Sequence, residues 1–173
     1  MAPLVQYDPR ATEVEVAGNT TLVLLPTIAD NTLKSVTVTE IEAGTAFECA
    51  TPAFGLVPSP STRESQNLCD KDARTKPGTT TWSIEALELD AGDPQADNAF
   101  VEGLVEGETR YVVQRDGKPH LDAFVAAQKI LAAEVTIQCV SRVPLQSGDD
   151  GGSYKWRIDL TVTKVEQFAL VAA

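Results

Sequence analysis

The segment that decides the fold reads Tyr-Lys-Trp-Arg-Ile-Asp-Leu-Thr-Val-Thr over residues 154–163. Its apolar side chains share one parity, and its charged and hydroxyl side chains take the other. Because successive side chains of a strand point to opposite faces, this alternation predicts a strand with one packed face and one solvent-exposed face. The alternation slips after Thr163, since Lys164 falls on the apolar parity. This slip predicts either a bulge there or a neighbour packed on the second face.

A second alternating segment precedes the first and gives it a partner. Val135, Ile137 and Cys139 alternate with polar residues, and the polar, glycine-rich stretch 146–153 lies between the two segments. Polar and glycine residues between two alternating runs are typical of a hairpin. The two segments therefore predict one long antiparallel hairpin.

Further strands are predicted along the chain. They cover residues 14–16, 22–25, 36–41, 82–86 and 110–115. The uninterrupted apolar run at 22–25 favours a strand buried on both faces, and Asp116-Gly117 supplies the turn that ends the strand at 110–115. After a short loop from Leu121, another strand is expected to start near Gln128. Trp82 and Trp156 lie on apolar parities and are expected in the core.

One helix is predicted. Asp93 suits the cap and Pro94 the first helical position, and Gly107 is the expected stop. An apolar stripe made by Phe100, Val101, Leu104 and Val105 indicates the buried face of this helix.

The stretch from Thr51 to Thr80 differs from its surroundings. It contains four prolines and many hydroxyl and charged residues, a composition that predicts a long loop. Loops of this length without regular structure are usually functional or disordered. The fold class predicted is mainly β: an antiparallel sandwich or barrel of two packed sheets with one flanking α-helix. Residues 1–173 are expected to form a single domain, with the long loop at about 51–80.

The totals exclude several classes of protein. The 173 residues carry 25 acidic and 14 basic side chains, a net charge of −11, which argues against a surface that grips nucleic acid. No apolar run reaches the roughly 18 residues of a membrane span, and no signal peptide is expected at the N-terminus. Cys49, Cys69 and Cys139 are interpreted as three buried thiols, with a bridge between Cys49 and Cys69 as the alternative.

The residues of an active site are missing from the sequence. The one histidine, His120, sits in a polar turn and is expected to be a solvated loop residue. Common hydrolase and nucleotide-binding motifs do not occur. Two Asp- and Gly-rich turns lack the ligand spacing of a calcium loop. Abundant carboxylates leave a glycosidase-like pair open on numbers alone. We expect no enzyme activity, no catalytic residue, no cofactor and no metal.

One charge feature is notable. Between Pro77 and Arg110 the chain has eight acidic residues and no lysine or arginine. The plain interpretation is a solvated surface, and the functional one is an acidic surface that faces a lumen or a basic patch of a partner. The residues are Glu85, Glu88, Asp90, Asp93, Asp97, Glu102, Glu106 and Glu108.

The order of several short motifs resembles the major tail tube proteins of siphophages, the phages with long non-contractile tails, especially those of actinobacteria. The motifs run from Ile28 to about Val165 and include Glu40-Ile41-Glu42-Ala43-Gly44, the Cys49 segment, Pro58-Ser59 with Cys69, the Trp82 strand, and Leu104-Val105-Glu106-Gly107 before Val112-Val113-Gln114-Arg115. The segment before Leu25 carries no matching motif.

The resemblance implies a structural virion protein without enzyme activity. In this family six copies form a ring, rings stack into a tube through which the genome is ejected, and the sheets of neighbouring copies join around the lumen. The implied partners are further copies of the chain, tape-measure, tail-tip and tail-terminator proteins, and double-stranded DNA that passes without specific binding. Assembly in the host cytoplasm and no membrane insertion are also implied.

The long loop is the candidate contact between rings in this interpretation. Its charged residues are Arg63, Glu64, Lys71, Asp72, Arg74 and Lys76, and Lys71, Arg74 and Lys76 could meet an acidic patch of a neighbouring copy. The main alternative function is a β-sandwich binding module of the adhesin or carbohydrate-recognition type. An enzyme and another virion part, such as a tail terminator or head-completion protein, are further alternatives.

Overall fold

The computed structural model describes residues 18–51, 54–65, 74–90, 99–143 and 155–173. The chain is mainly β, as predicted. Its elements are β1 (Thr20–Leu25), β2 (Ser35–Thr37), α1 (Val38–Glu42), β3 (Thr45–Ala46), a 3-10 turn (Glu48–Ala50), β4 (Leu56–Ser65), β5 (Arg74–Ile84), β6 (Leu87–Asp90), α2 (Ala99–Glu102), β7 (Thr109–Asp116), β8 (Lys129–Val143) and β9 (Lys155–Ala172).

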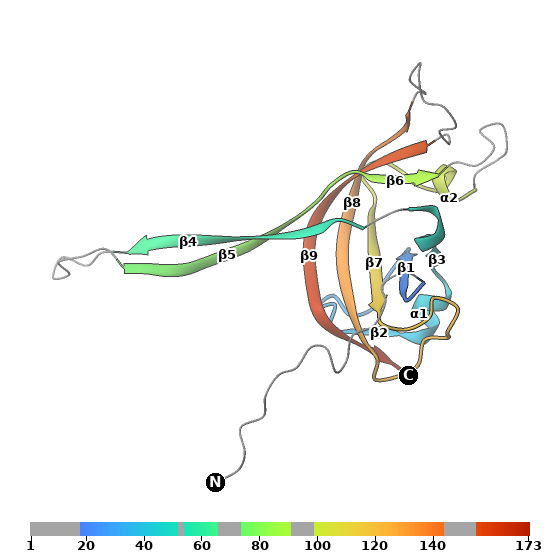
Figure 1. The fold of residues 1–173 in the computed structure, drawn as a ribbon, viewed down its shortest axis with the longest axis horizontal. Helices are drawn as coiled ribbons and strands as arrows, with labels where there is room; N and C mark the ends of the chain where they lie inside the picture. The colour runs from blue at the N-terminus through green and yellow to red at the C-terminus, as the bar shows by residue number, and fades with distance from the viewer. Residues whose placement is uncertain (1–17, 52–53, 66–73, 91–98, 144–154) are drawn as a thin grey trace, which may run out of the picture.

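The strands form two sheets. The larger sheet has the order β2-β9-β8-β7-β1-β3, and β6 also pairs with β9. This sheet curls around a core and makes up the body of the molecule, while β4 and β5 pair only with each other and project from it as a long arm (Figure 1). The predicted mainly β fold, sandwich- or barrel-like with two sheets, is confirmed. It differs in detail, because β2 pairs parallel with β9 and the described residues form two short helices, α1 and α2, where one flanking helix was predicted.

The long hairpin predicted from the C-terminal alternation is confirmed. β8 and β9 pair antiparallel along most of their length. The slip after Thr163 is a bulge: Lys164 pairs with Glu134 and Val162 with Val135, so Thr163 has no residue opposite it. Because Thr163 is an extra residue on β9, the apolar side chain of Val165 that follows it points to the core face again. The sequence showed this bulge as a break in the alternation.

The strand at 22–25 is buried on both faces, as its continuous apolar run predicts. Val23 and Val113 belong to one core cluster, whereas their ladder neighbours Leu24 and Val112 belong to a second cluster. Neighbouring residues of a strand point to opposite faces, so the two clusters cover the two faces of the central strands. The strands predicted at 110–115 and near Gln128 are also confirmed, as β7 and β8.

The strand predicted at 36–41 is wrong beyond Thr37. The chain turns there into α1, because Thr37 and Glu40 form a capping box: the Glu40 backbone N–H donates to the Thr37 hydroxyl, and the Thr37 N–H donates to the Glu40 carboxylate at 2.7 Å. Gly44 then lets the chain pass close to β1, since a Cβ there would lie 2.6 Å from a methyl of Val23.

The predicted helix is shorter than the apolar stripe in the sequence indicated. Its proposed cap, Asp93-Pro94, lies outside the described residues, and α2 ends at Glu102, before Gly103. Val101 is buried as predicted, but Val105 is 60% exposed. Gly107, the expected stop, instead takes a positive φ of 82° in the turn before β7. The stripe therefore extends past the end of the helix.

The loop predicted between Thr51 and Thr80 is for the most part the β4–β5 arm. A proline disturbs a sheet only where a neighbouring strand would accept a hydrogen bond from the N–H that proline lacks. In a two-stranded ribbon each strand has one edge without a neighbour, so a proline can be tolerated there. The ladder passes through Pro58, Pro60 and Pro77, with a bulge on β5 where Gly78 and Thr79 face the single residue Ser61. Gly78 is required there, since a Cβ would lie 2.8 Å from the Ser61 carbonyl oxygen. Of the helices that the structure describes, none is long and apolar enough to cross a membrane.

Candidate assembly surfaces

The arm is the first candidate surface. Strands of ten and eleven residues give it a length of about 30 Å. Toward its far end the register places Arg63 opposite Lys76 and Ser65 opposite Arg74. Three basic residues thus occupy ladder positions on the distal part of the ribbon, a composition that suits an acidic partner. Arg63 is exposed, Glu64, Arg74 and Lys76 lie in the paired strands, and Lys71 and Asp72 fall outside the described residues.

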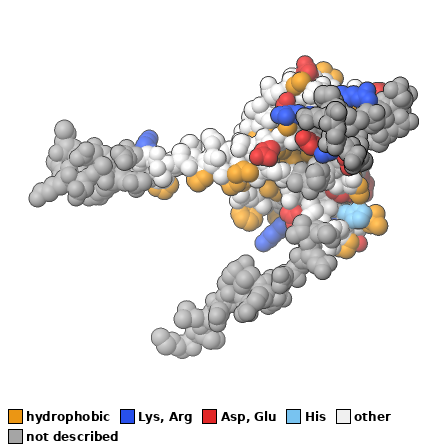
Figure 2. All heavy atoms as spheres, turned by 45° about the horizontal axis from the view of Figure 1, so that its top comes forward, with side chains coloured by type: hydrophobic (Ala, Val, Ile, Leu, Met, Phe, Trp, Pro, Cys, Tyr) orange, Lys and Arg blue, Asp and Glu red, His pale blue; other side chains and the backbone are white. Residues whose placement is uncertain are grey.

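A groove lies where the arm meets the body. It holds about 430 Å³ and is lined by Pro58, Pro60, Thr80, Trp82, Val165, Glu166, Gln167 and Phe168. Trp82 was expected in the core, but it is half-buried and forms part of this wall, whereas Trp156 packs against the core as expected. Phe168 is 72% exposed. Figure 2 shows hydrophobic side chains along the arm and where it joins the body.

The groove runs beside an open edge of the larger sheet. On the side away from β8, β9 pairs with β6 at Lys155–Ile158 and with β2 at Leu170–Ala172. Between these positions β9 has no ladder partner on that side among the described residues. The Phe168 N–H donates to the carboxylate of Glu166 at 3.2 Å, so a side chain already meets one edge amide.

The loop between β7 and β8, residues 117–128, is the second apolar surface, and no pattern in the sequence predicted it. Leu121 is 86% exposed and Val125 is 55% exposed. This loop lies at the end of the body where β7 ends and β8 begins (Figure 1). His120, expected to be solvated, is half-buried in this loop, and its backbone N–H donates to the Gly18 carbonyl oxygen.

Arg115 holds this loop to the sheet. Its side chain is 1% exposed, and it donates to the carbonyl oxygens of Pro119 (2.9 Å), Asp122 (2.9 Å) and Ala123 (3.2 Å) and to the Thr21 hydroxyl. The guanidinium also stacks 4.2 Å from the centre of the Phe124 ring. Burial lowers the pKa of Arg115, while Asp122 and Glu48 raise it. The motif Val112-Val113-Gln114-Arg115 predicted that Arg115 lies in a strand, but it did not predict the contacts of Arg115 with the loop.

The acidic stretch forms a surface around β6, α2 and the turn before β7. Glu85, Asp90, Glu102 and Glu106 are exposed, Glu88 and Glu108 are half-buried, and Asp93 and Asp97 lie outside the described residues. Although the sequence stretch has no basic residue, the fold brings basic residues from other segments to its edges. Lys155 of β9 pairs with Glu88 at 3.1 Å. The surface is therefore less negative than the sequence alone implies.

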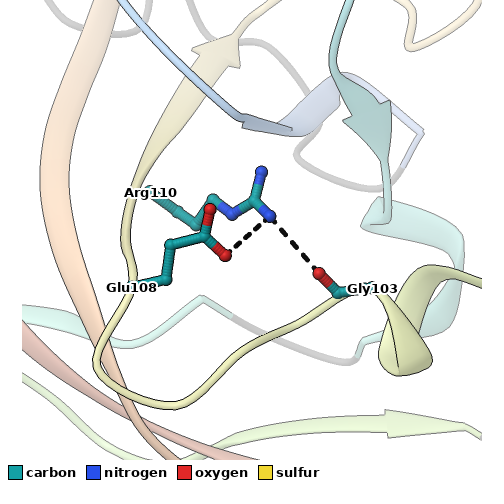
Figure 3. Close-up of polar contacts among 3 residues, drawn as sticks. All are labelled: Gly103, Glu108 and Arg110. Carbon is teal, nitrogen blue, oxygen red and sulfur yellow. Dashed lines mark hydrogen bonds and ion pairs between the residues drawn. The ribbon is translucent and has the colours of Figure 1, made fainter.

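At the turn before β7, a second acidic residue of this surface is also paired with a basic side chain. Arg110 pairs with Glu108 at 2.8 Å and also donates to the Gly103 carbonyl oxygen at 3.3 Å (Figure 3). The guanidinium therefore links the start of β7 to the residue that follows α2. Glu108 therefore serves the fold through this contact, while Glu102 and Glu106 are exposed on the same surface.

Groups that could carry chemistry are sparse in the described part of the chain. No group of three or more His, Cys, Asp and Glu side chains there could hold a metal ion. Cys139 is half-buried, and burial raises the pKa of its thiol further from neutral pH, with Glu106 adding to the shift. Cys49 is exposed and free, so its interpretation as a buried thiol is wrong, and Cys69 lies outside the described residues.

A comparison with known families bears on these surfaces. The model of the family described as phage tail tube protein matches residues 10–173. The match extends beyond both ends of the segment that carries the resemblance found in the motifs, and it includes part of the N-terminal segment without a matching motif. No curated protein matches this chain.

Proposed function

Because this chain belongs to the phage tail tube protein family, we propose that copies of it form hexameric rings that stack into the tube of a long non-contractile tail. The chain is a structural protein of the virion tail and not an enzyme. We further propose a siphophage of the actinobacteriophage type, assembly in the host cytoplasm, and genome ejection through the tube. Tape-measure, tail-tip and tail-terminator proteins are the proposed partners besides the chain itself.

The size of one copy supports a multimeric tube. A compact domain of 173 residues has a radius of gyration of roughly 16 Å. The core clusters pack side chains against both faces of the central strands, so the described part of the body offers no channel for a DNA duplex. A lumen must therefore lie between copies, and a contact that repeats by rotation closes into a ring.

The arm is the observation that carries the proposal. A two-stranded ribbon is marginally stable on its own in water, and three or more strands or a packed partner are needed to support it. The arm extends from the body with only its base packed against it (Figure 1). A neighbouring copy would supply the missing support, so we propose that the distal arm is the contact between rings.

Charge indicates where the arm would bind. The register gathers Arg63, Arg74 and Lys76 on the distal arm, and Glu102 and Glu106 are exposed on the acidic surface of the body. Oppositely charged surfaces on one chain suit a contact between copies in successive rings. The second interpretation, an acidic wall facing the lumen, would keep DNA phosphates from binding during passage.

Electron microscopy of the purified chain tests the proposal. At high protein concentration we expect hollow tubes with a regular axial repeat. The matched variant replaces residues 63–75 by two glycines, which closes the ladder beyond the Thr62–Pro77 pair with a short turn. We expect this variant to be folded and to form no tubes, because the distal contact is missing.

Two outcomes would count against the proposal. A wild-type chain that remains a single subunit at every concentration would contradict the tube and favour a binding module. Tubes formed equally well by the shortened variant would leave the tube standing and remove the arm from the contact between rings. Circular dichroism of both chains checks that the shortened variant keeps its β structure.

A further inference from the structure

The loop of residues 117–128 exposes apolar side chains although its backbone is firmly held. Five of the seven residues from Leu121 to Ala127 are exposed and apolar. Flexible loops can turn such side chains inward, but Arg115 fixes three carbonyl oxygens of this loop from beneath. Exposed apolar groups on a pre-organised backbone are typical of an interaction surface, because ordering has already taken place before the partner binds.

The groove at the base of the arm is a matching receptor. It is open, lined mainly by apolar and aromatic side chains, and bounded by Trp82 on the arm and Phe168 on β9. Trp and Phe side chains in such a groove can enclose an aliphatic group from a partner. The unpaired edge of β9 forms its floor, and edges of this kind are often covered by a loop or paired with another chain.

Side-chain docking fits this edge better than an added strand. The Glu166 carboxylate already accepts the Phe168 N–H, so a strand that paired here would have to displace it. The bulge at Thr163 also distorts the edge just before this point. Bulges re-aim side chains and interrupt pairing. An apolar side chain that enters the groove does not need to form hydrogen bonds with the β9 backbone.

We propose that Leu121 and Val125 of one copy insert into the groove between the arm and β9 of a second copy. The two surfaces lie at different places on the chain, so the contact is heterologous and repeats from copy to copy. Such a contact leads to closed rings or to filaments, which are the two geometries that a stacked tube contains. The inference rests on the proposed tube function, because that function supplies the second copy.

A double-mutant cycle on assembly tests the contact. The variants are Leu121→Ser, Phe168→Ser and the two combined, and Ala46→Ser is the matched control, since Ala46 is exposed and apolar but lies outside the loop, the groove and the acidic surface. The readout is the lowest protein concentration at which light scattering and electron microscopy detect assemblies. Thermal unfolding checks that each variant keeps the fold, which the exposure of these side chains favours.

We expect each single variant to raise the assembly concentration by about tenfold or more, the effect of losing one buried apolar anchor. The combined variant should need no higher protein concentration for assembly than the more impaired single variant, because both substitutions remove the same contact. Ala46→Ser should match the wild type.

Other outcomes would overturn the inference. If both variants assemble like the wild type, the loop and groove lie outside the contacts while the tube function stands. If only Phe168→Ser is impaired, a different segment occupies the groove, such as the arm of another copy. If the two losses multiply, the surfaces act at separate contacts. A wild-type chain that never assembles would overturn the tube function together with this inference.

Discussion

Arg115 shows at the scale of one residue how the fold fixes a surface. A buried cation is costly unless its donors are satisfied. Here one hydroxyl and three carbonyl oxygens accept from the two terminal nitrogens, while Nε has no hydrogen-bond partner among the described residues. The planar guanidinium reaches several acceptors at once while its face stacks on Phe124. A lysine has a single ammonium group and no planar face, so it could not make this set of contacts.

Replacing Arg115 with lysine should therefore destabilise the chain. We expect Arg115→Lys to lower the free energy of unfolding by about 2–3 kcal/mol, the value of lost hydrogen bonds to a buried charged group. Urea unfolding followed by circular dichroism measures it. The control is Arg157→Lys, since Arg157 is an exposed partner of Asp159 and such pairs contribute about 0–1 kcal/mol. If both variants lose the same small amount of unfolding free energy, Arg115 does not hold the loop in the way proposed.

Helix α1 illustrates the scale of one element. Its five residues are too few to be stable alone, and its start is held by the capping box of Thr37 and Glu40. The Glu40 carboxylate also accepts the Ala29 N–H at 2.6 Å, and Asp30 accepts from the Thr32 N–H and hydroxyl. Two carboxylates thus organise the whole connection from β1 through β2 to α1.

These carboxylates make stability depend on pH. Burial alone would raise the pKa of Glu40, but hydrogen bonds from Thr37 and Ala29 outweigh it and hold the pKa below 4.5. The Thr32 hydroxyl and amide lower the pKa of Asp30 below 3.8. Both groups therefore bind protons more weakly in the folded state. Their stabilisation is present above the unfolded pKa values and is lost as the pH falls through the folded values.

We expect the melting temperature to fall as the pH drops below 4.5, the ordinary pKa of Glu40. Glu40→Gln should lower the melting temperature at neutral pH and weaken its dependence on pH in the acid range. Calorimetric scans between neutral and acid pH measure both effects. Glu42→Gln is the matched control, because Glu42 is an exposed carboxylate of the same helix. A Glu40→Gln profile that parallels the wild type would show that the capping box carries no such linkage.

The whole molecule combines an arm, a groove, a clamped loop and an acidic surface on one body. The acidic surface has two possible roles, and a charge reversal separates them. We expect Glu102→Lys with Glu106→Lys to prevent tube formation, because the basic distal arm of the next ring would meet like charge. Electron microscopy and light scattering at low and moderate salt measure it, with salt weakening the wild-type contact as well.

The opposite result would assign the surface to the lumen. If the reversed variant forms normal tubes but slows DNA passage in reconstituted particles, the carboxylates face the channel. Glu42→Lys is the control for a charge change elsewhere on the body, at an exposed residue of α1. A variant that neither disturbs the tube nor slows DNA would leave the acidic stretch as a solvated surface.

Much of the body was predictable because it depends on local alternation. The period of two assigns faces to residues 154–163 and 135–139, and the continuous apolar run at 22–25 requires burial on both faces. The break after Thr163 identified a bulge. By contrast, the capping box at Thr37 was hidden within a β-branched run, and its local hydrogen bonds outweighed strand propensity.

The candidate surfaces were only partly predictable. The charged residues of the 51–80 segment and the acidic stretch were visible as composition, but composition does not give pairing. Proline predicts loops in general, so the β4–β5 ribbon looked like a loop, although a ribbon with two free edges tolerates Pro58, Pro60 and Pro77. Lys155 and Arg110 reach the acidic stretch from other segments, which no local pattern reveals.

The sequence by itself determined the mainly β class, the long C-terminal hairpin, the strand buried on both faces, and the order of motifs that resembles tail tube proteins. These features follow from side-chain spacing along a few neighbouring residues. Only the tertiary structure decided that the 51–80 segment is an arm, that Trp82 and Phe168 bound a groove, and that Arg115 holds an exposed apolar loop. Each of these depends on residues distant in sequence, and their contacts arise only when the strands pair.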